Sequence, residues 1–411
     1  MSMPVEKGLD HTVDLLTEGY HFMRKRFDEF GTDIFQTRVM GKKMTCMKGP
    51  DAVKLFYDPS RFQRSGAVPK RIQKSLFGEG GVQVLDGSAH QVRKQMFLSL
   101  MTEENVRRVH QLSLEQWRLQ KSKWKSGQEV ILFDEAEEVL CRVACLWAGV
   151  PLKESELSQR AYDLGALIDA FGGVGPRYRE GRKARERTED WIRSLIEKFR
   201  SGAVVDVDHA LEVIATFKDE NGQLLDAQIA AVELINILRP VVAVARFIVF
   251  EALAIHDFPK YRSAMKGADD EFLEAFAQET RRYYPFAPFL GAMVRHDFEW
   301  KGHQFTEGDT VLLDLYGTNH DPKSWNAPEQ FRPERFLEET VTPYNFVPQG
   351  GGDPAQGHRC PGEEITVAIM KASLSFLVKE LDYSVAKGQD LTINTVRMPT
   401  LPASRMIIKI T

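Results

Sequence analysis

The segment 229–256, with the sequence IAAVELINILRPVVAVARFIVFEALAIH, constrains the fold more than any other part of the chain. It is apolar along nearly its whole length and long enough to run as a helix through the middle of a helical body. Its centre nevertheless carries Arg239 and Pro240. A proline inside a helix costs roughly 3 kcal/mol, and an unpaired buried charge is also costly. Two such penalties at adjacent positions need a reason.

Two interpretations of Arg239 and Pro240 remain open from the residues alone. In the first, Arg239 pairs with an acidic side chain and Pro240 only bends the helix. In the second, Arg239 is a cationic anchor that faces a cavity. Its natural partner would then be a carboxylate ligand, because a guanidinium binds carboxylates in a bidentate manner.

The loop 349–362, with the sequence QGGGDPAQGHRCPG, holds a single cysteine, Cys360. Five glycines and two prolines in fourteen residues exclude regular structure. Pro361 is expected to lie in the first turn of a helix, because the run 364–378 has apolar residues at helical spacing. A helix N-terminus favours thiolate over thiol. We therefore expect Cys360 to be a nucleophile or a metal ligand, with simple packing in a turn as the alternative.

Composition limits the class of protein. The chain has 411 residues, 43% of them hydrophobic, which is ample for a large core, and no clean boundary divides the sequence, so we expect one domain over 1–411. A net charge of −4 argues against a nucleic-acid partner. Four cysteines indicate a reducing compartment. No uncharged apolar stretch reaches about 18 residues and no signal peptide is evident, so we expect a cytoplasmic protein without a membrane segment.

The periodicity of apolar residues predicts a mainly α protein with a smaller β-rich part. Strands are expected at 34–39 and 43–47, with a turn at Gly41, and again after Arg295, in FEWKGHQF, TVLLDLYG and the final RMIIKIT. The β-rich part therefore combines both ends of the sequence. The expected helices are 10–30, 102–125, 133–148, 154–171, 178–199 and 226–256.

Two arginine motifs lie in the second half of the chain. In ETRRYYPFAPF, Glu279 and Arg282 are three residues apart on one helix face, close enough to pair. Further on, FRPERF offers Arg335 as a third member. A glutamate between two arginines predicts a structural ionic cluster without catalytic duty.

These motifs, followed by a cysteine loop that ends in CPG before a helix, resemble the cytochrome P450 superfamily in order and spacing. The resemblance covers essentially the whole chain. It implies the P450 fold, a helical bundle around haem with small β-sheets. It also implies haem b (iron protoporphyrin IX) as cofactor, with Cys360 as the axial thiolate of the iron, a ligand that favours cleavage of an O–O bond.

The chain departs from the common superfamily pattern at two places. Asp353 and Gln356 stand where the usual cysteine loop has a phenylalanine and a glycine. Arg239 and Pro240 stand where the superfamily has its oxygen-activating acid and threonine. Both departures match one branch: QGGG with GHRCPG, LRP, RRYYPF, LDLYGTNHDP and FRPERF are similar to the bacterial fatty-acid peroxygenases.

This branch implies a function with hydrogen peroxide as co-substrate and no required redox partner. A fatty acid enters carboxylate first and pairs with Arg239, and its own acid group then acts as general acid and base in splitting the peroxide. Hydroxylation at the α or β carbon follows. The alternatives are a decarboxylase that forms terminal alkenes, a monooxygenase that depends on a redox partner, and a non-catalytic haem protein that binds fatty acids.

The resemblance also assigns roles around the haem. Gln83, in GVQVLDG, matches a site where hydroxylases of the branch carry glutamine and the best-known decarboxylase carries histidine. It implies catalytic roles for Gln83, Arg239 and Pro240. His90 matches a haem-propionate position, and either Arg93 or Lys94 supplies the accompanying cation.

The remaining assignments concern the cysteine loop and the substrate. His358 is placed among the cofactor-binding residues, while Phe171, Gly172 and Phe289 are placed along the substrate channel together with Arg239 and Gln83. For Phe171 the local sequence indicates only a helix end, so core packing is an equal alternative.

Overall fold

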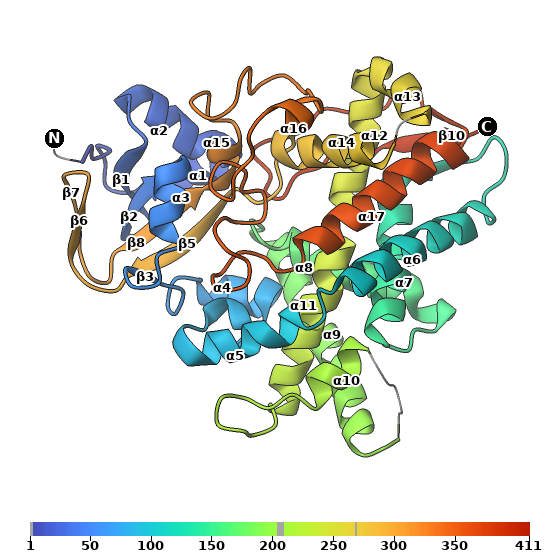
Figure 1. The fold of residues 1–411 in the computed structure, drawn as a ribbon, viewed down its shortest axis with the longest axis horizontal. Helices are drawn as coiled ribbons and strands as arrows, with labels where there is room; N and C mark the ends of the chain where they lie inside the picture. Colours follow the sequence, from blue (N-terminus) through green and yellow to red (C-terminus); the bar gives the residue numbers. More distant parts are fainter. Residues whose placement is uncertain (1–2, 204–208, 268) are drawn as a thin grey trace.

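The computed structural model describes residues 3–203, 209–267 and 269–411. Helices dominate, and the described strands form three small sheets. Most of the sheet structure lies at one side of the molecule, beside the N-terminus, and the helices fill the rest (Figure 1). The fold class that the periodicity predicts is confirmed, and it is the architecture of a helical body with a small β-rich part.

The largest sheet joins strands from residues 34–63 with strands from residues 289–314. Its strand order is β1-β2-β8-β5-β3. The hairpin of β1 and β2 turns at Gly41, and β2 then pairs in parallel with β8, with Thr45 opposite Val311. The strands of this sheet are β1 (Ile34–Val39), β2 (Lys42–Met47), β3 (Phe62–Gln63), β5 (Phe289–Val294) and β8 (Thr310–Asp314).

The two smaller sheets are built from short strands. One has the order β4-β10-β9 and the other is the hairpin β6-β7. Their bounds are β4 (Glu129–Ile131), β9 (Tyr383–Val385), β10 (Ile407–Ile410), β6 (Phe298–Trp300) and β7 (His303–Phe305). The sequence analysis missed β3, β4, β5 and β9, because a run of two to six residues becomes a strand only through pairing with a distant segment.

The helices that carry the core and the site make up most of the molecule (Figure 1). The α-helices are α1 (Thr12–Glu18), α2 (Phe22–Phe30), α3 (Pro50–Phe56), α4 (Lys70–Ile72), α5 (Gly87–Leu98), α6 (Glu103–Lys121), α7 (Leu132–Ala148), α8 (Leu157–Asp169), α9 (Pro176–Arg200), α10 (Ala210–Ala215), α11 (Ala227–Ala243), α12 (Ala245–Asp257), α13 (Pro259–Lys266), α14 (Asp270–Tyr283), α15 (Leu315–Asn319), α16 (Arg335–Glu338) and α17 (Glu363–Ser375). Short turns of other helix types include η2 (Gln73–Phe77) and η3 (Val82–Val84).

The central segment forms two helices instead of the single helix that was predicted over 226–256. α11 runs through the middle of the helical body and packs against α7, α8 and α9 (Figure 1). It ends at Ala243, and α12 begins at Ala245. Between them the backbone N–H of Val244 donates to the carbonyl of Val241, three residues back. The break therefore lies one turn after Pro240, which stays inside α11 and lacks only the hydrogen bond to the carbonyl four residues before it.

Several other predicted helices have different bounds, among them the one expected over 102–125, which ends at Lys121. The helix expected over 10–30 is interrupted at Gly19, where a side chain would collide with the carbonyl of Thr395. The helix expected over 154–171 begins as a 3₁₀ turn and ends at Asp169. α17 begins at Glu363 with Gly362 as its N-cap, so Pro361 lies before the helix and not in its first turn.

The end of TVLLDLYG also differs from the expected strand. β8 ends at Asp314, whose side chain accepts the backbone N–H of Gly317 and so caps α15. In the part of the chain that the structure describes, no helix has the length and apolar character needed to cross a membrane.

Candidate active site

The cysteine loop 349–362 folds back on itself before α17. The backbone N–H of Cys360 donates to the carbonyl of Gln349 at 3.2 Å, which closes the loop. Gly350 and Gly352 have φ values of 96° and 79°, a region that favours glycine. A side chain at Gly351 would lie 2.4 Å from Val53 of α3. The glycine-rich sequence thus allows the loop to approach α3 closely.

Cys360 is half-buried at the end of this loop. Burial raises the pKa of its thiol, although the backbone N–H of Gly362 and the charges of Lys94 and Arg281 act in the opposite direction. The helix N-terminus favours thiolate as expected, through the N–H of Gly362, but burial outweighs this effect. A metal cation deprotonates a coordinating thiol outright, so this environment suits a thiol that ionises when it binds a metal.

A set of charged and polar side chains holds the loop in place. Arg281 of α14 donates to Oε1 of Gln349 at 2.7 Å and also pairs with Glu363. Arg359 donates twice to Glu363, at 2.8 and 2.6 Å. Sequence reasoning missed these residues. The signal was the extra arginine in ETRR, since Arg281 precedes the Arg282 of the ionic motif.

Glu279, Arg282 and Arg335 form one buried ionic cluster. Arg282 donates from Nε and Nη2 to the two carboxylate oxygens of Glu279, at 2.7 and 2.9 Å. Nε of Arg335 lies 3.1 Å from Oε2 of the same carboxylate. All three side chains are fully buried, so the cluster joins α14 to α16 inside the protein.

Arg239 has no acidic partner among the described residues. Its side chain is 8% exposed, its Nη2 donates to Oδ1 of Asn236 at 3.3 Å, and its Nε is buried without a hydrogen-bond partner. Burial lowers the pKa of Arg239 to about 9; repulsion from Arg185 adds to this effect, and attraction to Cys360 opposes it. The structure thus excludes an acidic partner within its described part and leaves the interpretation of a cationic anchor.

A polar network connects Arg239 to Gln83 and to α5. The amide nitrogen of Asn236 donates to Oε1 of Gln83 at 3.4 Å and to Glu233 at 3.0 Å. Glu233 is fully buried and pairs with Arg93 at 2.6 Å. The guanidinium of Arg93 is therefore held by α11 in this structure, which does not favour Arg93 as the cation for a haem propionate.

The other residues predicted around the haem lie near the cysteine loop. Nζ of Lys94 donates to the carbonyls of Gly357 and Arg359, at 3.0 and 2.5 Å. The rings of His90 and His358 are stacked with centroids 3.8 Å apart. Burial, with smaller contributions from His358 and Lys94, lowers the pKa of His90 to about 3.

Arg64 was missed by the sequence analysis. It is 7% exposed and stacks on the ring of Phe56 at 4.2 Å. Its charge lowers the pKa of both His90 and His358, so it lies in the same polar group. No local motif marks Arg64, because its neighbours come from α3, α5 and the cysteine loop.

The residues predicted for the substrate channel lie in or beside a group of apolar side chains, which we call the apolar cluster and define at the end of this paragraph. The rings of Phe171 and Phe289 lie 6.4 Å apart. The backbone N–H of Gly172 donates to the carbonyl of Met398, and a side chain at Gly172 would lie 2.5 Å from that oxygen. The apolar cluster consists of Ile72, Leu76, Phe77, Ile168, Phe171, Ala243 and Phe286.

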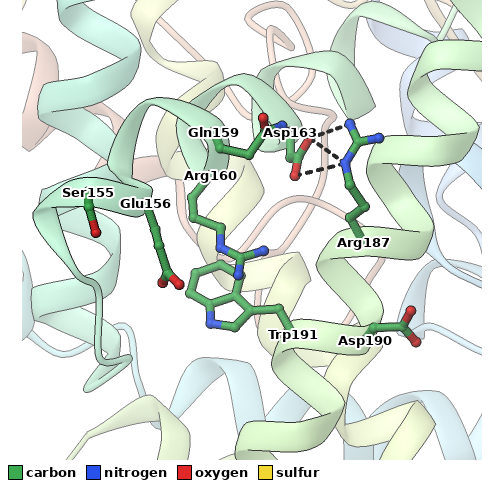
Figure 2. Close-up of a pocket in the computed structure, with 8 residues that line it drawn as sticks. All are labelled: Ser155, Glu156, Gln159, Arg160, Asp163, Arg187, Asp190 and Trp191. Carbon is green, nitrogen blue, oxygen red and sulfur yellow. Dashed lines mark hydrogen bonds and ion pairs between the residues drawn. The ribbon is translucent and has the colours of Figure 1, made fainter.

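The cleft in Figure 2 lies elsewhere, between α8 and α9. It has a volume of about 610 Å³. Asp163 and Arg187 pair across it at 2.6 Å, and Arg160 lies over the ring of Trp191 at 4.3 Å. None of the residues predicted for the site lines this cleft, so it is separate from the surroundings of Cys360 and Arg239.

Comparisons with known proteins agree with this geometry. The family profile of cytochrome P450 matches residues 268–409. The solved structure of cytochrome P450EX alpha with myristic acid is 43% identical, covers 100% of this chain and 98% of its own, and has a TM-score of 0.94. Cytochrome P450SP alpha in complex with (R)-ibuprophen is 45% identical, with 98% of each chain covered and a TM-score of 0.95.

A third structure extends the comparison. A variant of cytochrome P450 OleT in complex with arachidonic acid is 35% identical, covers 100% of this chain and 98% of its own, and has a TM-score of 0.96. The ligands named for these three relatives are all carboxylic acids. The identity extends over whole chains, and the chain therefore belongs to the cytochrome P450 family, in its fatty-acid peroxygenase branch.

Proposed function

We propose that this protein hydroxylates long-chain fatty acids at the α or β carbon, with hydrogen peroxide as the oxidant. The observation that carries the proposal is Arg239, a buried guanidinium with an unpartnered Nε and no acidic partner among the described residues. Such a group is stabilised by an anion, and a carboxylate matches its geometry. The carboxylic acids bound by the three relatives support the same class of substrate.

The prosthetic group of the family is haem, and the residues present fit it. The donor set offers one thiol, Cys360, which suits an axial ligand and not a four-ligand zinc site. His90, His358, Lys94 and Arg64 would hold the propionate side of the haem, because these polar side chains gather beside the cysteine loop. When bound, haem supplies the activation of peroxide and the oxidation of a C–H bond.

The first duty of the protein's own residues is to orient the substrate. Arg239 binds the carboxylate of the fatty acid, and Asn236 fixes the guanidinium by accepting from its Nη2. The acyl chain then extends along the apolar cluster, where Phe77 lies 5.6 Å from the guanidinium carbon. The α and β carbons are held nearest to Arg239, which is the physical reason for reaction at those positions.

The second duty is a proton transfer, and the described residues that contact Arg239 supply no free carboxyl group to perform it. Glu233 is the carboxylate in the network around Arg239, and it already accepts from Arg93 and Asn236. The substrate carboxylate, held by Arg239, therefore takes and returns the proton when peroxide is split. Pro240 offers no donor for this step, and Gln83 offers its amide, held by Asn236.

A single assay tests the proposal. The purified holoenzyme is incubated with a saturated fatty acid and hydrogen peroxide, and the products are separated by chromatography. We expect α- or β-hydroxy acids with peroxide alone. Turnover only with NADPH and a reductase would show a monooxygenase, a terminal alkene as main product would show a decarboxylase, and binding without any product would show a non-catalytic fatty-acid protein.

A further inference from the structure

We propose a second carboxylate-binding site, formed by Arg177, Arg246 and Arg397 around Asp169 at the surface end of the apolar cluster. The inference rests on the proposed function only for the class of ligand, the carboxylate of a fatty acid. We call these four residues the arginine cluster. Asp169 is the last residue of α8, and Arg177 lies at the start of α9. Arg246 lies on α12, and Arg397 lies in the loop before β10.

Three guanidinium groups converge on one carboxylate in the arginine cluster. Nη2 of Arg397 donates to Oδ1 of Asp169 at 2.5 Å, and Nε of Arg177 lies 3.0 Å from Oδ2. Nη2 of Arg246 is 3.8 Å from Oδ1. One negative charge among three positive charges leaves the cluster strongly cationic.

Arg246 is the member that points to a ligand. Its side chain is 2% exposed, and its Nε and Nη1 are buried without a hydrogen-bond partner among the described residues. A buried guanidinium with free N–H groups costs several kcal/mol unless an anion satisfies it. Arg246 therefore offers two unused donors in a place where water is largely excluded.

A further acid, Glu137 of α7, attracts Arg246 without a hydrogen bond to its Nε or Nη1. Burial raises the pKa of Glu137 to about 8, in spite of the attraction to Arg246. The raised pKa weakens the negative charge that Glu137 presents to Arg246. Nε and Nη1 of Arg246 have no hydrogen-bond partner among the described residues, so both donors remain available for an anion from outside the chain.

The arginine cluster adjoins the apolar cluster at two points. Ile168 directly precedes Asp169, and Ala243 precedes Arg246 by one helical turn. Arg239 lies on α11 and Arg246 lies on α12, on either side of the break at Val244. Arg239 and the arginine cluster therefore both border the apolar cluster, Arg239 through Phe77 and the arginine cluster through Ile168 and Ala243.

Exposure decreases inward through the arginine cluster. The side chain of Arg397 is 46% exposed, that of Arg177 is 24% exposed and that of Arg246 is 2% exposed. The turn between α8 and α9 that carries Gly172 lies against the same loop, since Arg177 donates to the carbonyl of Met398 at 2.5 Å. An anion that approaches from solvent thus meets cations before it meets the apolar side chains.

One chemistry, a carboxylate, could come from two sources. It could be the headgroup of a fatty acid on its way to Arg239, which would raise the association rate. It could instead be the second carboxylate of an α,ω-dicarboxylic acid whose first carboxylate is held by Arg239. If the headgroup of an entering fatty acid binds the arginine cluster, loss of an arginine slows the association of the fatty acid. If the second carboxylate of a dicarboxylic acid binds there, loss of an arginine weakens the equilibrium affinity for that acid.

The test uses holoenzyme with hexadecanoic acid and hexadecanedioic acid as probes. Dissociation constants are measured by calorimetry, and association rates are measured by stopped flow at low and high salt. The variants are Arg397→Gln and Arg246→Met. Arg193→Gln is the matched control, since its side chain lies on α9 and is 41% exposed in an ion pair with Asp190. Arg397 is partly exposed, so Arg397→Gln remains informative if Arg246→Met does not fold.

We expect at least one of two effects in the variants and neither in the control. Slower association of hexadecanoic acid, by about tenfold at low salt and less at high salt, would identify the entering headgroup. An affinity for the dicarboxylic acid that falls about tenfold, with the affinity for the monocarboxylic acid unchanged, would identify the second carboxylate. Unchanged rates and affinities for both acids, or equal changes in the control, would overturn the site. Failure of wild-type holoenzyme to bind hexadecanoic acid would instead contradict the proposed function.

Discussion

The side-chain amide of Gln349 donates a hydrogen bond to the sulfur of Cys360, with 3.5 Å between Nε2 and Sγ. The orientation of this amide is fixed from its other end, because Oε1 accepts from Arg281 at 2.7 Å. Nε2 also lies 3.2 Å from the hydroxyl of Thr366 on α17. A donor aimed at a ligating sulfur tunes the metal that the sulfur binds, since it stabilises the negative charge of the thiolate.

Gln349→Leu should lower the reduction potential of the haem iron. The thiolate loses a donor worth about 0.5–1.5 kcal/mol and so becomes a stronger ligand to the oxidised iron. Spectroelectrochemical titration of the holoenzyme measures the potential. Gln304→Leu, which removes an exposed amide on β7, is the control. Equal potentials for wild type and Gln349→Leu would show that the hydrogen bond has no effect on the iron.

Arg239→Met should reduce peroxide-driven hydroxylation of fatty acids by about 100-fold or more, because the variant neither binds the carboxylate nor brings its acid group into place. Product formation under saturating peroxide measures the loss. The carbon-monoxide difference spectrum should show that haem remains bound through Cys360. Unimpaired turnover in this variant would refute substrate-assisted cleavage of peroxide.

A substrate without an acid group should react poorly until a short carboxylic acid is added. The added acid occupies Arg239 and performs the missing proton transfer, so we expect an increase of about 100-fold or more. Rates with and without the added acid, measured on wild type and on Arg239→Met, check this. The increase should be absent in the variant, and an equal increase in both proteins would contradict the role of Arg239.

Glu279→Gln should destabilise the folded protein by about 3–5 kcal/mol, because Arg282 and Arg335 keep their buried charges and lose their shared counter-ion. The change in the urea midpoint of unfolding measures this loss. Glu299→Gln is the control, since that side chain makes an exposed hydrogen bond on β6. A midpoint equal to that of the control would show that the ionic cluster does not hold α14 and α16 together.

His320 should contribute a pH-dependent part of the stability. Burial lowers its pKa to about 3 from the usual 6.5, so the unfolded chain takes up a proton before the folded protein does. The stabilisation is therefore complete above about pH 6.5 and is lost as the pH falls toward about 3, at up to about 1.4 kcal/mol per pH unit.

His320→Gln should remove this dependence. Free energies of unfolding in urea at about pH 7.5 and about pH 5 should differ less for the variant than for wild type, because glutamine does not titrate in this range. His296→Gln, at an exposed histidine, serves as the control. The same loss of stability on acidification in wild type and in His320→Gln would exclude His320 as its source.

The sequence by itself determined the helical body, a β-rich part that combines early and late segments, and the pairing of Glu279 with Arg282. Each of these depends on spacing along the chain, and local geometry converts spacing directly into a helix face or a strand. The cysteine loop was also evident from the sequence, because its glycines and prolines exclude regular structure and a helical pattern follows it. Resemblance to a known family then indicated the cofactor and the class of substrate.

Only the tertiary structure decided which charged groups have partners. It bound Arg93 to Glu233, left Arg239 and Arg246 with unused donors, and raised the pKa of Cys360 against the influence of the helix N-terminus. The physical reason is that burial and pairing depend on segments that are distant in sequence. Whether a guanidinium on α11 has a hydrogen-bond partner depends on the side chains that α5, η3 and the cysteine loop bring near it. A local sequence pattern does not predict these neighbours.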